Sequence, residues 1–187
     1  MKIIETPIPG LFVVETNVLS DSRGYFFEAW QEERYKFAGI ETSFIQDNES
    51  KSVQGVIRGL HYQLEPWSQA KLVRVVEGCV FDVAVDLRVN SPTFGKWFGI
   101  ELDGISKKQL FIPRGFAHGF SVLSETAVFL YKCDNLYNRQ AERAININDP
   151  MLKINWKLKE IVPVVSDKDK NAPYFKDAEM NFNISKK

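Results

Sequence analysis

The stretch of residues 57–63, Ile-Arg-Gly-Leu-His-Tyr-Gln, carries residue types suited to chemistry. It contains His61, one of two histidines in the chain, and Lys71 follows ten residues later. The remaining residues are mostly apolar or aromatic, which is typical of a largely buried strand. A buried imidazole and guanidinium cost stability unless they are paired or used. The stretch is therefore either an active-site strand or a core strand whose histidine binds a backbone carbonyl.

Further polar side chains lie in segments that read as strands. They are His118, Tyr131 and, two residues apart on one face of segment 44–50, Gln46 and Asn48. A histidine base, a tyrosine acid and cations that hold negative charge would equip the protein for proton transfer. Taken singly, these residues have ordinary structural interpretations, such as a core tyrosine or a surface lysine with a buried stem.

Other chemistries are less well supported. Position 63 is glutamine, so the chain lacks a His-x-His pair, and only two histidines and carboxylates remain as metal ligands. No glycine-rich loop has phosphate-binding or dinucleotide-binding spacing, and no serine lies in a nucleophile elbow. Cys79 and Cys133 lie in apolar runs, as buried free thiols do. We therefore expect no metal and no cofactor.

The elements that must position these residues are short strands. Turn signals recur every 8–12 residues or so, and the best helical segment, 31–38, is stopped by Gly39. Segment 79–87 alternates so that Asp82 and Asp86 fall on the face opposite the apolar residues. The pattern predicts one all-β domain, a sandwich or barrel, over residues 1–187. Periodicity fades near the end, so 170–187 is expected to be a tail that is either mobile or wrapped back onto the body.

The charge and hydrophobicity of the chain limit the classes of partner that the sequence supports. The 24 basic and 24 acidic residues cancel, which gives no support for nucleic acid or an anionic membrane as a partner. No apolar run approaches the ~20 residues that span a bilayer, and no signal peptide is evident at the N-terminus. We expect a cytoplasmic protein.

Several ordered motifs resemble the dTDP-4-dehydrorhamnose 3,5-epimerase family over residues 8–170 or so. The matching segments are Asp-Ser-Arg-Gly-Tyr-Phe (21–26), Gln-Asp-Asn (46–48), Arg-Gly-Leu-His-Tyr-Gln (58–63), Lys-Leu-Val-Arg (71–74), Ser-Pro-Thr-Phe-Gly (91–95), Pro-Arg-Gly-Phe-Ala-His-Gly-Phe (113–120), Leu-Tyr-Lys (130–132) and Ser-Asp-Lys-Asp (166–169). The resemblance implies a cupin-type jelly roll with a few short peripheral helices. It also implies a homodimer, a dTDP-sugar substrate and no metal.

The family's reaction inverts C3 and C5 of a 4-keto sugar nucleotide by removing a proton next to the ketone and returning one to the opposite face. By resemblance, His61 is the base, Asp169 its partner, Tyr131 the acid, and Lys71 the cation that stabilises the enolate. The remaining matches are to substrate-binding positions: Arg23, Phe26, Glu28, Gln46, Asn48, Arg58, His118, Tyr137, Glu142 and Lys168. Arg23 and Glu28 are expected to serve either their own site or that of a partner subunit.

Some alternatives remain open at this stage. Asp167 competes with Asp169 as the partner of His61. The chain could epimerise only C3 or only C5, bind sugar nucleotides without catalysis, or be a metal-dependent cupin isomerase. Leu19 stands where some family members have an aromatic residue, so Phe26 or Tyr137 would have to supply the stacking on the base.

One structural expectation follows from spacing alone. Arg58 and His61 are an odd number of residues apart, so a regular strand would point them to opposite faces. If both reach one substrate, the strand must bulge, and Gly59 is the residue that allows it.

Overall fold

Two antiparallel sheets form the body of the protein in the computed structural model, which describes residues 1–183. The first sheet has the order β1 (Lys2–Glu5), β2 (Phe12–Glu15), β10 (Gln109–Ile112), β7 (Lys71–Glu77), β12 (Thr126–Cys133) and β5 (Gln46–Val53). The second has the order β13 (Glu142–Ala144), β6 (Val56–Gln63), β11 (Phe116–Val122), β8 (Cys79–Asp86) and β9 (Trp97–Asp103), and β14 (Val164–Val165) pairs with β6 in parallel. A separate hairpin consists of β3 (Leu19–Asp21) and β4 (Gly24–Phe26).

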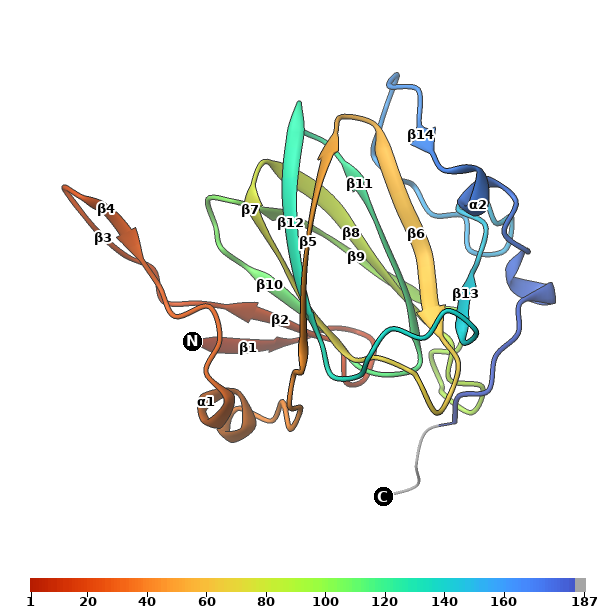
Figure 1. The fold of residues 1–187 in the computed structure, drawn as a ribbon, viewed down its shortest axis with the longest axis horizontal. Coiled ribbons are helices and arrows are strands. Elements are labelled where there is room, and N and C mark those ends of the chain that lie inside the picture. Colours follow the sequence, from red (N-terminus) through yellow and green to blue (C-terminus); the bar gives the residue numbers. More distant parts are fainter. Residues whose placement is uncertain (184–187) are drawn as a thin grey trace.

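Helical structure is short and peripheral (Figure 1). Helix α1 (Glu32–Phe37) lies inside the predicted segment 31–38. The Gln31 side chain caps it by accepting from the Arg34 N–H. Helix α2 (Asp167–Lys170) and a 3₁₀ turn, η1 (Phe175–Asp177), follow near the C-terminus. The prediction of an all-β jelly roll of the cupin type with a few short helices is confirmed. No helix within residues 1–183 is long and apolar enough to cross a membrane.

The main core lies between the two sheets. Apolar side chains from β7, β10 and β12 meet those from β8 and β11 there, with Val73, Phe129 and Phe120 among them. The outer faces of the sheets are also covered. Tyr35 of α1 packs on the first sheet, and the segment that follows β13 packs on the second.

The alternation predicted for segment 79–87 is present, and both faces of the strand are covered. Its apolar residues occupy both faces, because Val83 faces the outer cluster while Val80 and Ala84 face the main core. Asp82 and Asp86 are both fully buried. Asp86 binds Arg88 at 2.8 Å, and the partner of Asp82 lies in the site described below.

The strands of the N-terminal region are short. Strands β3 and β4 form a hairpin that projects away from the body (Figure 1). All six residues of the two strands are exposed. The projecting hairpin offers apolar surface to solvent, since Leu19, Tyr25 and Phe26 are 63%, 57% and 70% exposed.

The C-terminal segment wraps back onto the body (Figure 1). Phe175 and Phe182 are buried in the cluster on the outer face of the second sheet. The Tyr62 hydroxyl donates to the Glu179 carbonyl at 2.7 Å. Of the tail expected over 170–187, residues 184–187 lie outside the described part of the chain.

Strand β6 contains the predicted bulge. His118 of β11 pairs with His61 and Phe120 pairs with Arg58, so three steps on β6 oppose two on β11. Gly59 has a φ of +131°, and its bond to the next residue is cis. A Cβ on Gly59 would lie 2.5 Å from the Gly119 Cα, so two glycines let the strands approach at this point.

Candidate active site

Two cavities meet at one end of the inter-sheet space. The larger, about 350 Å³, is lined by Gln46, Asn48, His61, Tyr62, Gln63, Gln69, Lys71, Tyr131, Cys133, Tyr137 and Glu142. The smaller, about 150 Å³, is lined by Ser50, Arg58, His61, Lys71, His118, Phe120, Phe129 and Tyr131. Three of the proposed catalytic residues line both cavities: His61, Lys71 and Tyr131.

The bulge in β6 decides which side chains of this strand line the cavities. Ile57, Leu60 and Tyr62 all pack in the outer cluster, although an unbroken alternation would send Ile57 and Leu60 to opposite faces. The extra residue shifts the phase of the strand, so Arg58 and His61 both line the smaller cavity. The Arg58 Nε also donates to the Ser52 hydroxyl at 3.0 Å.

His61 is paired with Asp169. Its Nε2 lies 2.7 Å from Asp169 Oδ1, and the Asp169 side chain is 4% exposed against 32% for His61. Burial is the largest single influence on the pKa of Asp169 and would raise it. The hydrogen bond and charge attraction of His61, together with hydrogen bonds from Gly59 and Ser166, outweigh burial, so the net pKa is lowered. Asp167 points elsewhere, with 95% of its side chain exposed. Asp169, not Asp167, is therefore the residue in contact with the histidine.

Strand β14 and helix α2 place the Asp169 carboxylate next to His61. Val164 and Val165 pair in parallel with the start of β6 and lead directly into α2. The Ser166 hydroxyl caps that turn by accepting from the Asp169 N–H at 3.2 Å. Asp169 Oδ2 accepts in turn from the N–H of Gly59 at 3.4 Å. The bulge therefore contributes a second donor to the same carboxylate.

Lys71 and Tyr131 face His61 from the first sheet. Both lie on the inner face, where Cys133 pairs with Lys71 across the β12–β7 ladder and Tyr131 pairs with Asn48 across the β12–β5 ladder. The Lys71 Nζ is 5.8 Å from the centre of the Tyr131 ring. Burial lowers the pKa of Lys71 and raises that of Tyr131. At neutral pH the tyrosine hydroxyl consequently keeps its proton.

His118 is engaged by a second buried carboxylate. Its Nε2 lies 2.9 Å from Asp82 Oδ2, and its ring stacks with Phe129 at 6.0 Å. Burial lowers the pKa of His118, against the opposing effect of Asp82, which favours the neutral ring near pH 7. Each histidine is thus held by one carboxylate. Among the described residues, no group of three or more histidine, cysteine, aspartate or glutamate side chains is arranged to hold a metal ion.

Tyr137, Glu142 and Lys168 form a connected group beside the larger cavity. Glu142 Oε2 accepts from the Tyr137 hydroxyl at 3.0 Å and pairs with Lys168 Nζ at 2.5 Å. Burial would raise the pKa of Glu142, but the hydrogen bonds from Lys168 and Tyr137 lower it overall. The Tyr137 N–H donates to Gln46 Oε1 at 3.3 Å, and Gln46 Nε2 donates to Asn48 Oδ1 at 3.0 Å.

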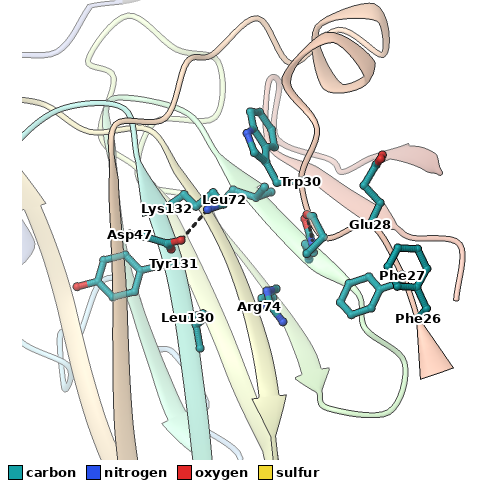
Figure 2. Close-up of a pocket in the computed structure, with 12 residues that line it drawn as sticks. Phe26, Phe27, Glu28, Trp30, Asp47, Leu72, Arg74, Leu130, Tyr131 and Lys132 are labelled. Carbon is teal, nitrogen blue, oxygen red and sulfur yellow. Dashed lines mark hydrogen bonds and ion pairs between the residues drawn. The ribbon is translucent and has the colours of Figure 1, made fainter. Parts of the chain in front are cut away.

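Three residues assigned by resemblance lie apart from these cavities within one chain. The Arg23 side chain is 89% exposed and pairs with Asp21 on the projecting hairpin. Phe26 and Glu28 line a different groove, of about 420 Å³, on the outer face of the first sheet. In Figure 2 the Tyr131 hydroxyl points away from Phe26 and Glu28. Tyr131 also contributes to the lining of this groove, but its hydroxyl lies on the other side of the sheet from these two side chains.

Sequence reasoning missed several residues that line the site. Cys133 lies two residues after Tyr131 and shares its face, so strand periodicity could have revealed it. Gln63 belongs to the 58–63 motif and excludes a His-x-His pair, but neither feature indicates that it lines the site. Asp82 lines neither cavity but binds His118, and its spacing in the strand gives no indication of that contact.

The arrangement defines a class of protein. A buried carboxylate orients a histidine on one sheet, while a protonated tyrosine and a lysine lie on the facing sheet of the same cavity. A base, an acid and a cation in this arrangement are typical of a jelly-roll enzyme that transfers protons to and from a carbon next to a carbonyl group.

Comparisons with known proteins give the family. The profile of the family described as dTDP-4-dehydrorhamnose 3,5-epimerase matches residues 5–177, and the chain belongs to this family. The Shigella flexneri enzyme of that name is 51% identical over 180 residues, covering 96% of this chain and 98% of the relative. The crystal structure of the Elizabethkingia anophelis enzyme is 53% identical, with a TM-score of 0.90 over 95% of this chain and 97% of the other.

A second solved structure carries a ligand. It is a dTDP-6-deoxy-D-glucose-3,5-epimerase from Legionella pneumophila in complex with dTDP-4-keto-L-rhamnose. This protein is 48% identical to the chain, with a TM-score of 0.90 over 94% of this chain and 93% of the other.

Proposed function

We propose that the protein converts dTDP-4-dehydro-6-deoxy-D-glucose to dTDP-4-dehydro-L-rhamnose by inverting C3 and C5, as a step of dTDP-L-rhamnose biosynthesis. The observation that carries this proposal is the 2.7 Å contact between His61 Nε2 and the buried Asp169, in a cavity shared with Lys71 and Tyr131. Family membership and the dTDP-sugar bound to the Legionella relative support the substrate class.

The first half of each inversion is proton removal. Because the lowered pKa of Asp169 keeps it ionised and acceptor-only, the His61 Nε2 carries a hydrogen and its Nδ1 keeps the lone pair. Nδ1 takes the proton from C3 or C5, and the electron pair moves through the C4 carbonyl to give an enolate oxygen. Lys71 stabilises that negative charge, and Asp169 stabilises the imidazolium.

The second half is reprotonation from the other side. His61 belongs to the second sheet and Tyr131 to the first, so a sugar ring held between them meets the base on one face and the acid on the other. Tyr131 delivers its proton as the enolate returns to the ketone, which inverts the carbon. Exchange with solvent then deprotonates the histidine and reprotonates the tyrosine, so each round is balanced.

Turnover in deuterated water tests this reaction. We expect deuterium at both C3 and C5 of the product by NMR. Label at one carbon alone would support the mono-epimerase alternative. Binding of the sugar nucleotide with no label at either carbon would leave a non-catalytic binding protein.

Metal independence is part of the same proposal, because proton transfer by these residues needs no Lewis acid. Full activity after exhaustive chelation is expected. Activity that disappears on chelation and returns with added Zn²⁺ or Mn²⁺ would instead indicate a metal-dependent isomerase. The free thiols Cys79 and Cys133 suit the reducing conditions of a cytoplasm, where we propose the protein acts.

We further propose a homodimer in which the projecting hairpin reaches the partner's cavity. The exposed apolar residues of the hairpin support this, since a second copy would bury them. In such a dimer Arg23, Phe26 and Glu28 would contact the substrate of the neighbouring subunit. Light scattering after gel filtration would measure the oligomeric state.

Complementation between two inactive variants tests the exchange of hairpins. Arg23→Ala removes the hairpin's cation and His61→Ala removes the base. When the two variants are mixed and allowed to exchange subunits, about a quarter of the sites would contain both native residues, so activity should reappear. A mixture that stays as inactive as its components, after exchange is verified, would place Arg23 in the site of its own chain.

A further inference from the structure

A buried glutamine of β6, Gln63, forms hydrogen bonds with the loop that carries Tyr137. Gln63 is 5% exposed and lies two residues from His61, so both side chains project toward the larger cavity. Its Nε2 donates to the Leu136 carbonyl at 3.1 Å and to the Trp67 carbonyl at 2.7 Å. Its Oε1 accepts from the Asn138 N–H at 2.6 Å.

Two of these contacts flank Tyr137. The Leu136 carbonyl belongs to the peptide group before Tyr137, and the Asn138 N–H belongs to the peptide group after it. A single side-chain amide therefore holds both peptide groups around one residue, much as a neighbouring strand would. Both polar atoms of Gln63 are bonded, as expected for a buried amide.

The side chain of Tyr137 is held from the adjacent strand. Its hydroxyl donates to Glu142, and Glu142 is the register partner of Gln63 in the β13–β6 ladder. The backbone and the ring tip of Tyr137 are thus fixed by two residues that lie opposite each other. Tyr137 lines the larger cavity and is 55% exposed, so its ring is accessible to a ligand.

We propose that Gln63 is a positioning residue that sets where the Tyr137 ring meets the nucleotide base, and so governs nucleotide affinity separately from proton transfer. This inference rests on the proposed function and takes Tyr137, one of the two rings expected to stack on the nucleotide base, as the ring that does so. Only a side chain with a donor and an acceptor on one planar group satisfies a carbonyl and an N–H together. A glutamate of the same shape retains the acceptor but loses both donors.

Gln63→Glu and the uncharged, similarly sized Gln63→Met provide the test. We expect the Kd for dTDP, measured by calorimetry, to rise at least about fivefold, because each lost hydrogen bond is worth roughly that factor. KM should rise more than kcat falls. Gln54→Glu is the matched control, since Gln54 is exposed, donates to the Leu123 carbonyl at 2.9 Å and lies outside both cavities.

A double-mutant cycle distinguishes positioning from general stability. If Gln63 acts through Tyr137, the rise in Kd caused by Gln63→Glu should disappear in a Tyr137→Ala background. A rise of equal size in both backgrounds, or no rise in the single variant, would overturn the inference. A native protein that turns over the sugar nucleotide while the cycle fails would leave the proposed function standing; a native protein that does not bind dTDP would remove that function itself.

The native protein offers a measurement that does not depend on folding of the variants. The Asn138 N–H, held by Gln63 in a loop, should exchange with deuterated water at least about tenfold more slowly than an unprotected amide. Exchange at the unprotected rate would show that the bond to Gln63 does not persist, and would also overturn the inference.

Discussion

Replacing Gly59 by alanine should disrupt the fold and the site together. Gly59 has a φ of +131°, and an added Cβ would lie 2.5 Å from the Gly119 Cα and 2.8 Å from the His118 carbonyl oxygen. Both neighbours are backbone atoms of a buried strand, so neither can rotate away. Strand β6 would have to move away from β11 or lose the bulge that aims Arg58 and His61 into one cavity.

The expected cost has two parts. An alanine in this backbone region costs about 1–3 kcal/mol, and forcing an extra methyl into a packed site costs about 1–3 kcal/mol more. The free energy of unfolding should therefore fall by about 2–6 kcal/mol, a large share of the ~5–15 kcal/mol typical of a domain. The substitution should also impair catalysis, because displacing the Gly59 N–H removes a hydrogen-bond donor from Asp169.

Gly39→Ala is the matched control. Gly39 also has a positive φ, +94°, but no described atom beyond its immediate chain neighbours lies within 4 Å of the position that an added Cβ would take. Only the backbone cost therefore applies to this variant. Urea unfolding at equal protein concentration would compare the two variants, and kcat would be measured below the transition. Equal losses of stability in both variants, with native kcat in Gly59→Ala, would refute the steric account of the bulge.

The remaining predictions concern the catalytic group. Asp169→Asn should lower kcat about tenfold to a hundredfold, because a charge-assisted hydrogen bond of about 1.5–3 kcal/mol is lost. The kcat of Asp167→Asn should stay within about twofold of the native value. Equal effects of the two substitutions would contradict the pairing of Asp169 with His61. Burial lowers the pKa of Lys71 below its ordinary 10.5, so this lysine loses its charge at a lower pH than an exposed lysine does, whereas burial raises the pKa of Tyr131. The kcat profile should consequently decline below pH 10.5, and in Lys71→Arg the residual activity should stay level there; an unchanged decline would assign it to another group. His61→Ala should abolish solvent deuterium incorporation but leave the Kd for dTDP within about threefold, and native turnover in that variant would exclude His61 as the base.

Short-range patterns in the sequence determined much of the fold and of the site. Alternation, closely spaced turn residues and the scarcity of helical periodicity predicted an all-β sandwich or barrel. The charged segment 31–38, ended by Gly39, predicted a short helix. The odd spacing of Arg58 and His61 predicted a bulge at Gly59 on the condition that both residues reach one substrate, because side-chain direction in a strand depends on local geometry. Ordered motifs indicated the family and most of the residues found around the cavities, although Arg23, Phe26 and Glu28 lie elsewhere within one chain.

Tertiary structure decided what depends on long-range packing. The contact of Asp169 with His61 joins residues 108 positions apart, and no local pattern favours it over Asp167. The burial of Asp82 beside His118 depends on which face of β8 the other sheet covers. No pattern around Gln63 in the sequence indicates its hydrogen bonds to the peptide groups on either side of Tyr137, because these bonds depend on a distant loop folding against β6. Such contacts are set by how sheets and loops pack, which periodicity along one strand does not encode.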